Sequence, residues 1–225
     1  MELEIRQIKK ELFGTVFEIW EDSTRQVGSI VMQGRLGSME GSFQIEYNGV
    51  KIQMSPTSRR KASAAAKPLI KRLPFRPYSA SGGVSNGIMF HDQIKTGFMK
   101  SAGYHLLFLD NTVYYLYFVG FGEKGICAPV YRGDEIIAEV RKECVVKDDL
   151  HEMRIVLDDA SNAVPLILLT CYMYVITYYN AGQKVVHGTQ KRVFYTKDEY
   201  LLSKCRTLPE YHEKRKKINV VKYKF

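Results

Sequence analysis

The segment Val164–Tyr179 constrains the fold of this 225-residue chain more than any other, because its sixteen residues include no charged side chain. It follows Asp158–Asn162, whose Asp, Ser and Asn side chains suit a helix N-terminus, and Asn180-Ala181-Gly182 supplies a stop. We therefore expect a helix within residues 158–181. A helix that is apolar on all sides must be surrounded by apolar groups, either lipid or the core of its own protein.

The length of this helix favours the protein core over a membrane. Sixteen residues at roughly 1.5 Å each span about 24 Å, less than the ~30 Å hydrocarbon layer of a bilayer. The four tyrosines of the segment do not gather at its two ends, as they would in an interfacial belt. We interpret Val164–Tyr179 as an internal core helix, with a membrane span as the alternative.

The residues before this helix alternate between apolar and polar side chains, which is typical of half-buried strands. The clearest hairpin is Ser42–Met54, in which Asn48-Gly49 is the preferred pair for a type I′ turn. Further hairpins and strands are expected at Leu3–Ile8, Thr15–Trp20 with Gln26–Val31, Gly87–His91, Tyr104–Leu109 with Thr112–Val119, Ile126–Tyr131 with Ile136–Arg141, and Met153–Leu157. This gives about ten to twelve short strands, and such a run indicates a sandwich or a barrel.

One segment interrupts the strands, and it is strongly basic. Residues 55–83 are rich in Ser, Ala, Pro and Gly and contain no acidic residue, and we expect them to form a flexible loop. Its cations are Arg59, Arg60, Lys61, Lys67, Lys71, Arg72 and Arg76. Because the whole chain has a formal charge of +9, an anionic partner is expected, either a membrane surface or nucleic acid.

The region after Gly182 is expected to add a last strand over Lys184–Tyr195. A capping-box pattern, Thr196-Lys197-Asp198-Glu199, then predicts a short helix, and a basic tail follows it to Phe225. We therefore predict one β domain over residues 1–195, followed by a short helix and tail over residues 196–225.

Two matches to catalytic or cofactor motifs fail on their context. Gly83-Val-Ser85-Asn-Gly87 fits a nucleophile elbow, but a strand-like stretch follows it where a helix is needed. Gly120–Gly125 fits a dinucleotide-binding pattern, yet it too precedes a strand, so it reads as a glycine-rich hairpin. His91 and Asp92 could serve as a general base and the carboxylate that orients it, but a lone histidine at a strand end is usually structural or solvated. We predict no catalytic residue, no metal site and no cofactor.

The cysteines and the first residues indicate the cellular compartment in which we expect the protein. The four cysteines are far apart in sequence and form no CxxC pair, which favours a reducing compartment. The first residues alternate charged and apolar side chains and do not have the apolar stretch of a secretory signal. We expect a cytoplasmic protein.

The chain resembles the tubby-like fold shared by tubby C-terminal domains, phospholipid scramblases and LURP-one-related proteins. Asp158-Asp159 followed by Ala163–Leu169 and the aromatic-aliphatic stretch through Tyr179 carry the resemblance, together with the hairpin Ala128–Lys142. It implies a mainly β (α+β) fold, a closed antiparallel barrel of about twelve strands that encloses a hydrophobic C-terminal helix. The long acidic segment that scramblases associate with calcium is reduced here to Asp158 and Asp159, which puts calcium-dependent scrambling in doubt.

The resemblance and the basic segment together lead to a functional prediction. We expect a non-enzymatic barrel protein that docks peripherally on anionic phospholipid or phosphoinositide surfaces through the seven cations of residues 59–76. The alternative is a nucleic-acid-binding module that uses the basic loop and the tail.

Overall fold

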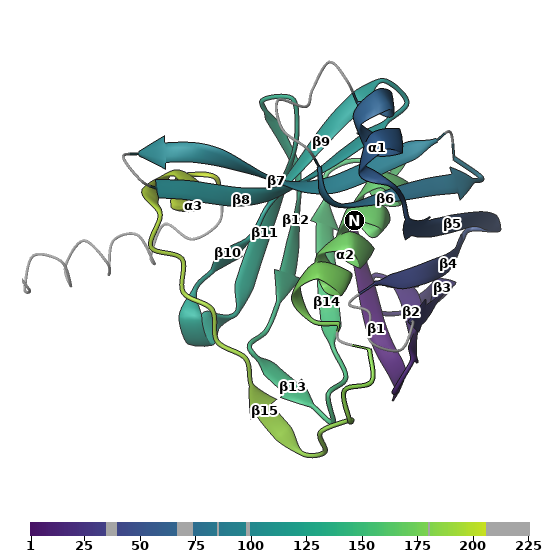
Figure 1. Ribbon diagram of the computed structural model, residues 1–225. Coiled ribbons are helices and arrows are strands. Elements are labelled where there is room, and N and C mark those ends of the chain that lie inside the picture. Colours follow the sequence, from purple (N-terminus) through teal and green to yellow (C-terminus); the bar gives the residue numbers. More distant parts are fainter. Residues whose placement is uncertain (35–39, 67–73, 85, 98–99, 180, 206–225) are drawn as a thin grey trace, which may run out of the picture.

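Twelve strands close into an antiparallel barrel around one helix, which confirms the predicted fold class (Figure 1). The computed structural model describes residues 1–34, 40–66, 74–84, 86–97, 100–179 and 181–205. In the order in which they pair around the ring, the strands are β1 (Glu2–Glu11), β2 (Gly14–Glu21), β3 (Arg25–Gly34), β4 (Gly41–Tyr47), β5 (Val50–Pro56), β6 (Phe75–Gly82), β7 (Gly87–Gly97), β8 (Lys100–Leu109), β9 (Thr112–Tyr117), β11 (Ile126–Arg132), β12 (Glu135–Lys142) and β14 (Glu152–Leu157). The pairing of β14 with β1 and of β9 with β11 closes the ring.

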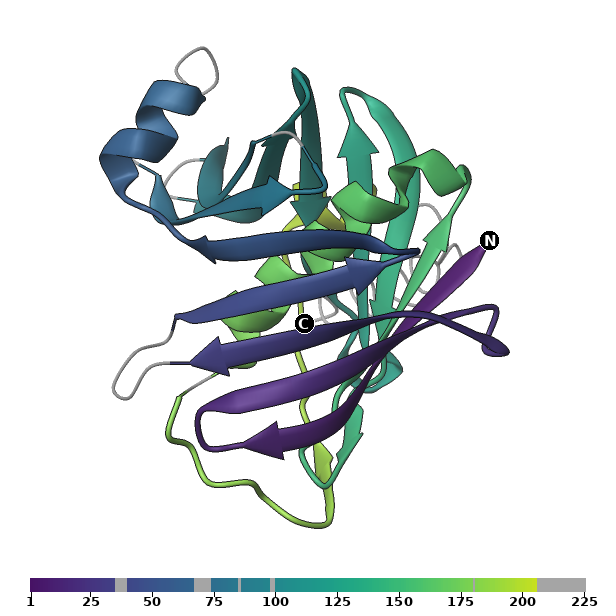
Figure 2. The same cartoon turned by 90° about the vertical axis from the view of Figure 1, so that its right-hand side faces the viewer.

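The remaining elements lie inside the barrel, on its wall or at one end. They are β10 (Val119–Gly120), β13 (Val145–Lys147), β15 (Thr189–Lys191), the helices α1 (Arg59–Ala65), α2 (Ala163–Thr177) and α3 (Glu199–Ser203), and the 3-10 turns η1 (Gly122–Lys124) and η2 (Ala160–Asn162). Helix α2 runs within the ring, whereas α1 projects outside it (Figures 1 and 2). Strands β13 and β15 form a separate two-stranded sheet.

The predicted Ser42–Met54 hairpin forms as expected. Asn48 and Gly49 have φ values of 47° and 79°, the left-handed pair that a type I′ turn needs. Ile45 pairs with Ile52 across the hairpin, and both side chains point into the barrel. The alternation of apolar and polar residues therefore predicted correctly that Ile45 and Ile52 face the interior of the barrel.

Helix α2 is the centre of the core, as predicted from Val164–Tyr179. Its residues Leu166–Val175 are all buried against the inward side chains of the strands. The window Ala160–Thr177 is long and apolar enough to cross a membrane, but 72% of it is buried inside the molecule. The barrel wall supplies the apolar surroundings that this helix requires.

Two tyrosines of this segment, Tyr172 and Tyr179, reach the backbone of the barrel wall. The Tyr172 hydroxyl donates a hydrogen bond to the carbonyl of Arg76 at 2.9 Å. The Tyr179 hydroxyl lies so close to Gly34 that a Cβ there would be 1.4 Å from it. Strand β3 therefore needs a glycine at this position.

The structure corrects three predictions about connecting segments. The expected flexible loop over residues 55–83 contains helix α1 and strand β6, because Ser58 caps α1 and two alanines of this segment pack on the barrel. The expected strand over Lys184–Tyr195 is reduced to β15, which pairs with β13 outside the ring. The last helix begins at Glu199 with Asp198 as its cap, because the Thr196 side chain instead accepts a hydrogen bond from the Gly120 amide.

Candidate functional site

Helix α1 carries three of the predicted basic site residues. Arg59, Arg60 and Lys61 form its first turn, and all three are exposed. Ala62 and Ala66 are each 0% exposed and pack with the buried Ile88, Phe90 and Leu106 on the wall. The methyl groups of the two alanines thus fix the helix on the barrel while its cations point to solvent.

These three cations are not neutralised by their surroundings. No ion pair to Arg59, Arg60 or Lys61 exists among the residues that the structure describes, and the first turn of α1 contains no acidic residue. Predicted site residues Lys67, Lys71 and Arg72 lie outside the described residues.

Arg76, the seventh predicted site residue, lies on β6, against which α1 packs. Its guanidinium lies over the ring of Phe75, 5.2 Å from the centroid, and Phe75 is 46% exposed. The backbone of Arg76 has a φ of 47°, and its carbonyl is held by the Tyr172 hydroxyl. A cation and an apolar ring are therefore presented together beside the helix that carries the other three cations.

Two histidines lie behind this surface. The Nδ1 atoms of His91 and His105 are 3.3 Å apart, so His91 faces His105 and does not form the base-and-orienter pair with Asp92. The Asp92 carboxylate instead accepts a hydrogen bond from the Tyr104 hydroxyl at 3.1 Å. Burial, together with the smaller effect of the neighbouring His91, lowers the pKa of His105 to about 3. Burial also lowers the pKa of His91, so both rings are neutral at neutral pH.

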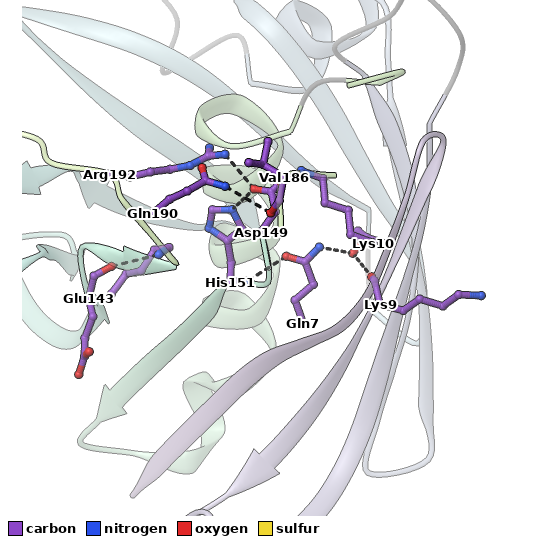
Figure 3. Close-up of polar contacts among 11 residues, drawn as sticks. Gln7, Lys9, Lys10, Glu143, Asp149, His151, Val186, Gln190 and Arg192 are labelled. Atoms are coloured by element: carbon purple, nitrogen blue, oxygen red, sulfur yellow. Dashed lines mark hydrogen bonds and ion pairs between the residues drawn. The ribbon is translucent and has the colours of Figure 1, made fainter. Parts of the chain in front are cut away.

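A second polar cluster lies at the end of the barrel where the C-terminus of α2 meets the β13–β15 sheet (Figures 1 and 3). The buried Asp149 carboxylate accepts a hydrogen bond from Arg192 Nη2 at 2.9 Å and forms an ion pair with Lys10. Gln7 Oε1 accepts a hydrogen bond from the His151 amide at 3.0 Å. These contacts bind the segment around β15 to β1 and to the turn before β14.

This cluster carries an excess of positive charge. His151 is buried beside Asp149, and burial together with the charges of Lys142, Arg192 and Lys10 lowers its pKa to about 2. The Lys142 ammonium lies 5.4 Å from the centroid of the Tyr178 ring, and burial, followed by the charge of Arg192, lowers its pKa to about 8. The cluster thus keeps an imidazole neutral and an amine unusually easy to deprotonate.

Two buried polar side chains in this cluster form no hydrogen bond with any described residue. Neither ring nitrogen of His151 forms a hydrogen bond within the described part of the chain, and the Tyr178 hydroxyl has none either. The two rings stack at a centroid distance of 4.7 Å. Because α2, the turn before β14 and the β15 segment enclose them, we assign this cluster to closure of the barrel end.

A groove of 510 Å³ runs along the outer wall beside the cluster. It is lined by Glu2, Lys124, Ile126, Cys127, Arg141, Lys142, Glu143, Val145, Lys147, Leu150, Glu152, Arg154 and Val156. Its lining contains charges of both signs, and two of its cations are paired, since Arg154 pairs with Glu152 at 3.3 Å and Arg141 pairs with Glu139 at 2.8 Å. The groove therefore presents charges of both signs, whereas the first turn of α1 presents cations and no acidic residue.

Sequence reasoning missed the Asp149 cluster entirely. Lys10 and Asp149 are 139 residues apart in the chain, and only closure of the sheet brings them together. In the described ranges, no group of three or more His, Cys, Asp and Glu side chains has the geometry to hold a metal ion.

Comparisons with protein-family models, with curated proteins and with solved structures found no match to this chain.

Proposed function

We propose that this chain is a non-enzymatic barrel protein of the tubby-like class that docks peripherally on the anionic cytoplasmic face of membranes. The observation that supports docking is the first turn of α1, where Arg59, Arg60 and Lys61 are exposed, have no ion pair to any described residue and belong to a helix packed on the barrel wall. The twelve-strand barrel around one apolar helix supports the class, because it is the arrangement that the sequence resemblance implies.

The charges of α1 suit a lipid surface better than a specific pocket. Polybasic segments gain about 1 kcal/mol per Lys or Arg near an anionic leaflet, so three cations contribute about 3 kcal/mol, or roughly 100-fold in affinity. Phe75 adds an exposed apolar ring beside them, which suits the boundary between headgroups and acyl chains. A phosphoinositide would strengthen the same interaction through its additional phosphates.

Vesicle co-sedimentation tests this proposal. We expect the wild-type protein to bind phosphatidylcholine vesicles that contain about one-fifth phosphatidylserine, and to bind them less as salt rises toward 0.5 M, because salt screens exposed charges. The triple variant Arg59→Gln, Arg60→Gln, Lys61→Gln should bind these vesicles about 100-fold more weakly. Vesicles of phosphatidylcholine alone set the baseline.

A matched control separates local charge from total charge. Lys51, Lys184 and Lys197 are also exposed, and replacing all three with Gln removes the same net charge away from α1. This variant should retain most of the wild-type binding. Equal binding of wild-type protein to neutral and anionic vesicles would refute the proposal, as would equal losses in the two triple variants. If a single-stranded oligonucleotide releases the protein from vesicles at a concentration below that of the lipid, the nucleic-acid alternative is favoured.

A further inference from the structure

Three tyrosine rings surround a lysine ammonium on the outer wall of the barrel. The Lys204 Nζ atom lies 5.2 Å from the ring centroid of Tyr117, 5.0 Å from that of Tyr131 and 4.8 Å from that of Tyr200. Each distance is within the range of a cation–π interaction. We refer to Tyr117, Tyr131 and Tyr200 as the tyrosine cage.

Two walls of the cage belong to the barrel, and the third belongs to a helix packed on it. Tyr117 lies on β9 and Tyr131 on β11, and these are the strands whose pairing closes the ring. Their rings are nearly perpendicular, at 86° with centroids 5.7 Å apart. Tyr200 lies on α3, whose Leu201 and Leu202 are buried in the same side-chain cluster. The Tyr131 hydroxyl donates a hydrogen bond to the backbone carbonyl of Lys204 at 2.8 Å. The cage is therefore preformed by packing that does not depend on the Lys204 side chain.

The chemistry of the cage is that of neutral aromatic faces. Burial raises the pKa of Tyr117, and the adjacent Tyr200 hydroxyl raises it further, so the Tyr117 phenol does not supply a negative charge. Within the described ranges, no carboxylate lies within ion-pair distance of Lys204. Among the described residues, the ammonium is thus held by ring faces.

A primary ammonium is a poor match for such a site. It has three N–H donors and is strongly hydrated, and aromatic faces replace those hydrogen bonds incompletely. A methylated ammonium has fewer donors or none, loses less hydration, and is the type of cation that aromatic cages recognise. Lys204 is only half-buried and its flexible stem extends from the end of α3, so the ammonium can leave toward solvent without unpacking Leu201 and Leu202.

We propose that the tyrosine cage is a binding site for methylated ammonium groups, and that Lys204 is an intramolecular competitor that occupies the site when no ligand is bound. Two sources share this chemistry, the choline group of a headgroup or metabolite and a methylated lysine of another protein. The site is separate from the docking surface on α1 and does not depend on the function proposed for it.

Titration of the tyrosine ring signals by NMR tests the proposal with tetramethylammonium chloride as the probe. Removal of the competitor in Lys204→Ala should strengthen binding at least about tenfold over wild type, because the ligand then does not have to displace a tethered cation. Adding Tyr131→Leu to Lys204→Ala should reverse that gain, since leucine keeps an apolar side chain but removes one ring face, along with the hydroxyl that donates to the carbonyl of residue 204. Replacing the 67% exposed Tyr195 with Ala in the same background should leave the affinity unchanged. Sodium chloride at equal concentration controls for ionic strength.

The two sources are distinguished by two further titrants. Preference for glycerophosphocholine over a trimethyllysine peptide identifies a choline ligand, and the reverse preference identifies a methylated protein. If Lys204→Ala disturbs the amide signals of α3, Lys204→Gln and saturating tetramethylammonium on the wild-type protein replace it. The proposal is overturned if tetramethylammonium shifts the cage rings no more than sodium does, or if the Tyr131→Leu double variant binds it as tightly as Lys204→Ala.

Discussion

The inside and the outside of this barrel differ in how they use cations and tyrosines. Inside, the rings of α2 pack in the core, and the polar cluster at the barrel end holds Lys10 and Arg192 on the buried Asp149. Outside, the cations of α1 have no acidic partner among the described residues, and the Lys204 ammonium lies against three tyrosine faces. The buried side chains that pack or form ion pairs inside the barrel contribute to its stability. The exposed cations on the outer wall are available to bind partners.

Truncation of a leucine should lower the free energy of unfolding much more inside the barrel than on its surface. Leu168 is 0% exposed at the centre of α2, whereas Leu12 is 46% exposed between β1 and β2. Leu168→Ala should lower the free energy of unfolding by about 2–5 kcal/mol, because it leaves a cavity among close-packed neighbours. Leu12→Ala should lower it by less than about 0.5 kcal/mol. Urea unfolding measures both, and similar losses would contradict the assignment of α2 to the core.

Acid should destabilise the protein through its two buried histidines. Their folded pKa values, about 3 for His105 and about 2 for His151, are below the ordinary 6.5. Between these values the unfolded chain binds protons that the folded chain does not, so stability falls as pH falls below about 6.5. The two sites together should lower the free energy of unfolding by about 2 kcal/mol between pH 6.5 and 5.5.

The variants His105→Gln and His187→Gln test which histidine causes this slope. Urea unfolding at several pH values should show a shallower acid slope for His105→Gln. The exposed His187 should leave the slope unchanged when it is replaced. A wild-type stability that does not change between pH 6.5 and 5.5 would contradict the neutral, buried state of these rings.

Lys142 should change the free energy of unfolding less than the two histidines do, and at alkaline instead of acidic pH. Its folded pKa of about 8 is below the ordinary 10.5, so the folded chain loses its proton first and stability rises as pH increases from 8 toward 10.5. Lys142→Met keeps a long side chain without the buried charge. We expect it to raise the free energy of unfolding at pH 7 by about 1 kcal/mol and to remove the alkaline rise. A large loss of stability at pH 7 would show that the contact with Tyr178 outweighs the cost of burial.

Neutralisation of α1 should have the smallest effect on stability. Arg59, Arg60 and Lys61 have no ion pair within the described residues, so their replacement with Gln should change the free energy of unfolding by less than about 0.5 kcal/mol. Chemical denaturation of the triple variant checks this expectation. A larger change would mean that loss of vesicle binding reports damage to the fold.

The sequence predicted the inside far better than the outside, and the reason is local periodicity. Alternation along Ser42–Met54 and the absence of charge in Val164–Tyr179 act within short windows, so they specify the inward face and the core helix directly. Composition misled us over residues 55–83, because nothing in the local sequence indicates that Ala62 and Ala66 pack on a barrel wall. The cluster at Asp149 and the tyrosine cage depend on closure of the sheet and on the packing of α3. No local pattern in the sequence indicates either of them.

The central claim is that α1 is the surface that meets an anionic membrane, and amide hydrogen exchange of the wild-type protein tests it most directly. The Ala62 and Ala66 amides of this short helix donate to the carbonyls of Ser58 and Ala62, and the helix is exposed on its outer side. With vesicles that contain phosphatidylserine, we predict slower exchange over residues 58–66 and unchanged exchange in β13 and β15. Unchanged exchange over residues 58–66 while the protein is bound to vesicles would contradict the claim.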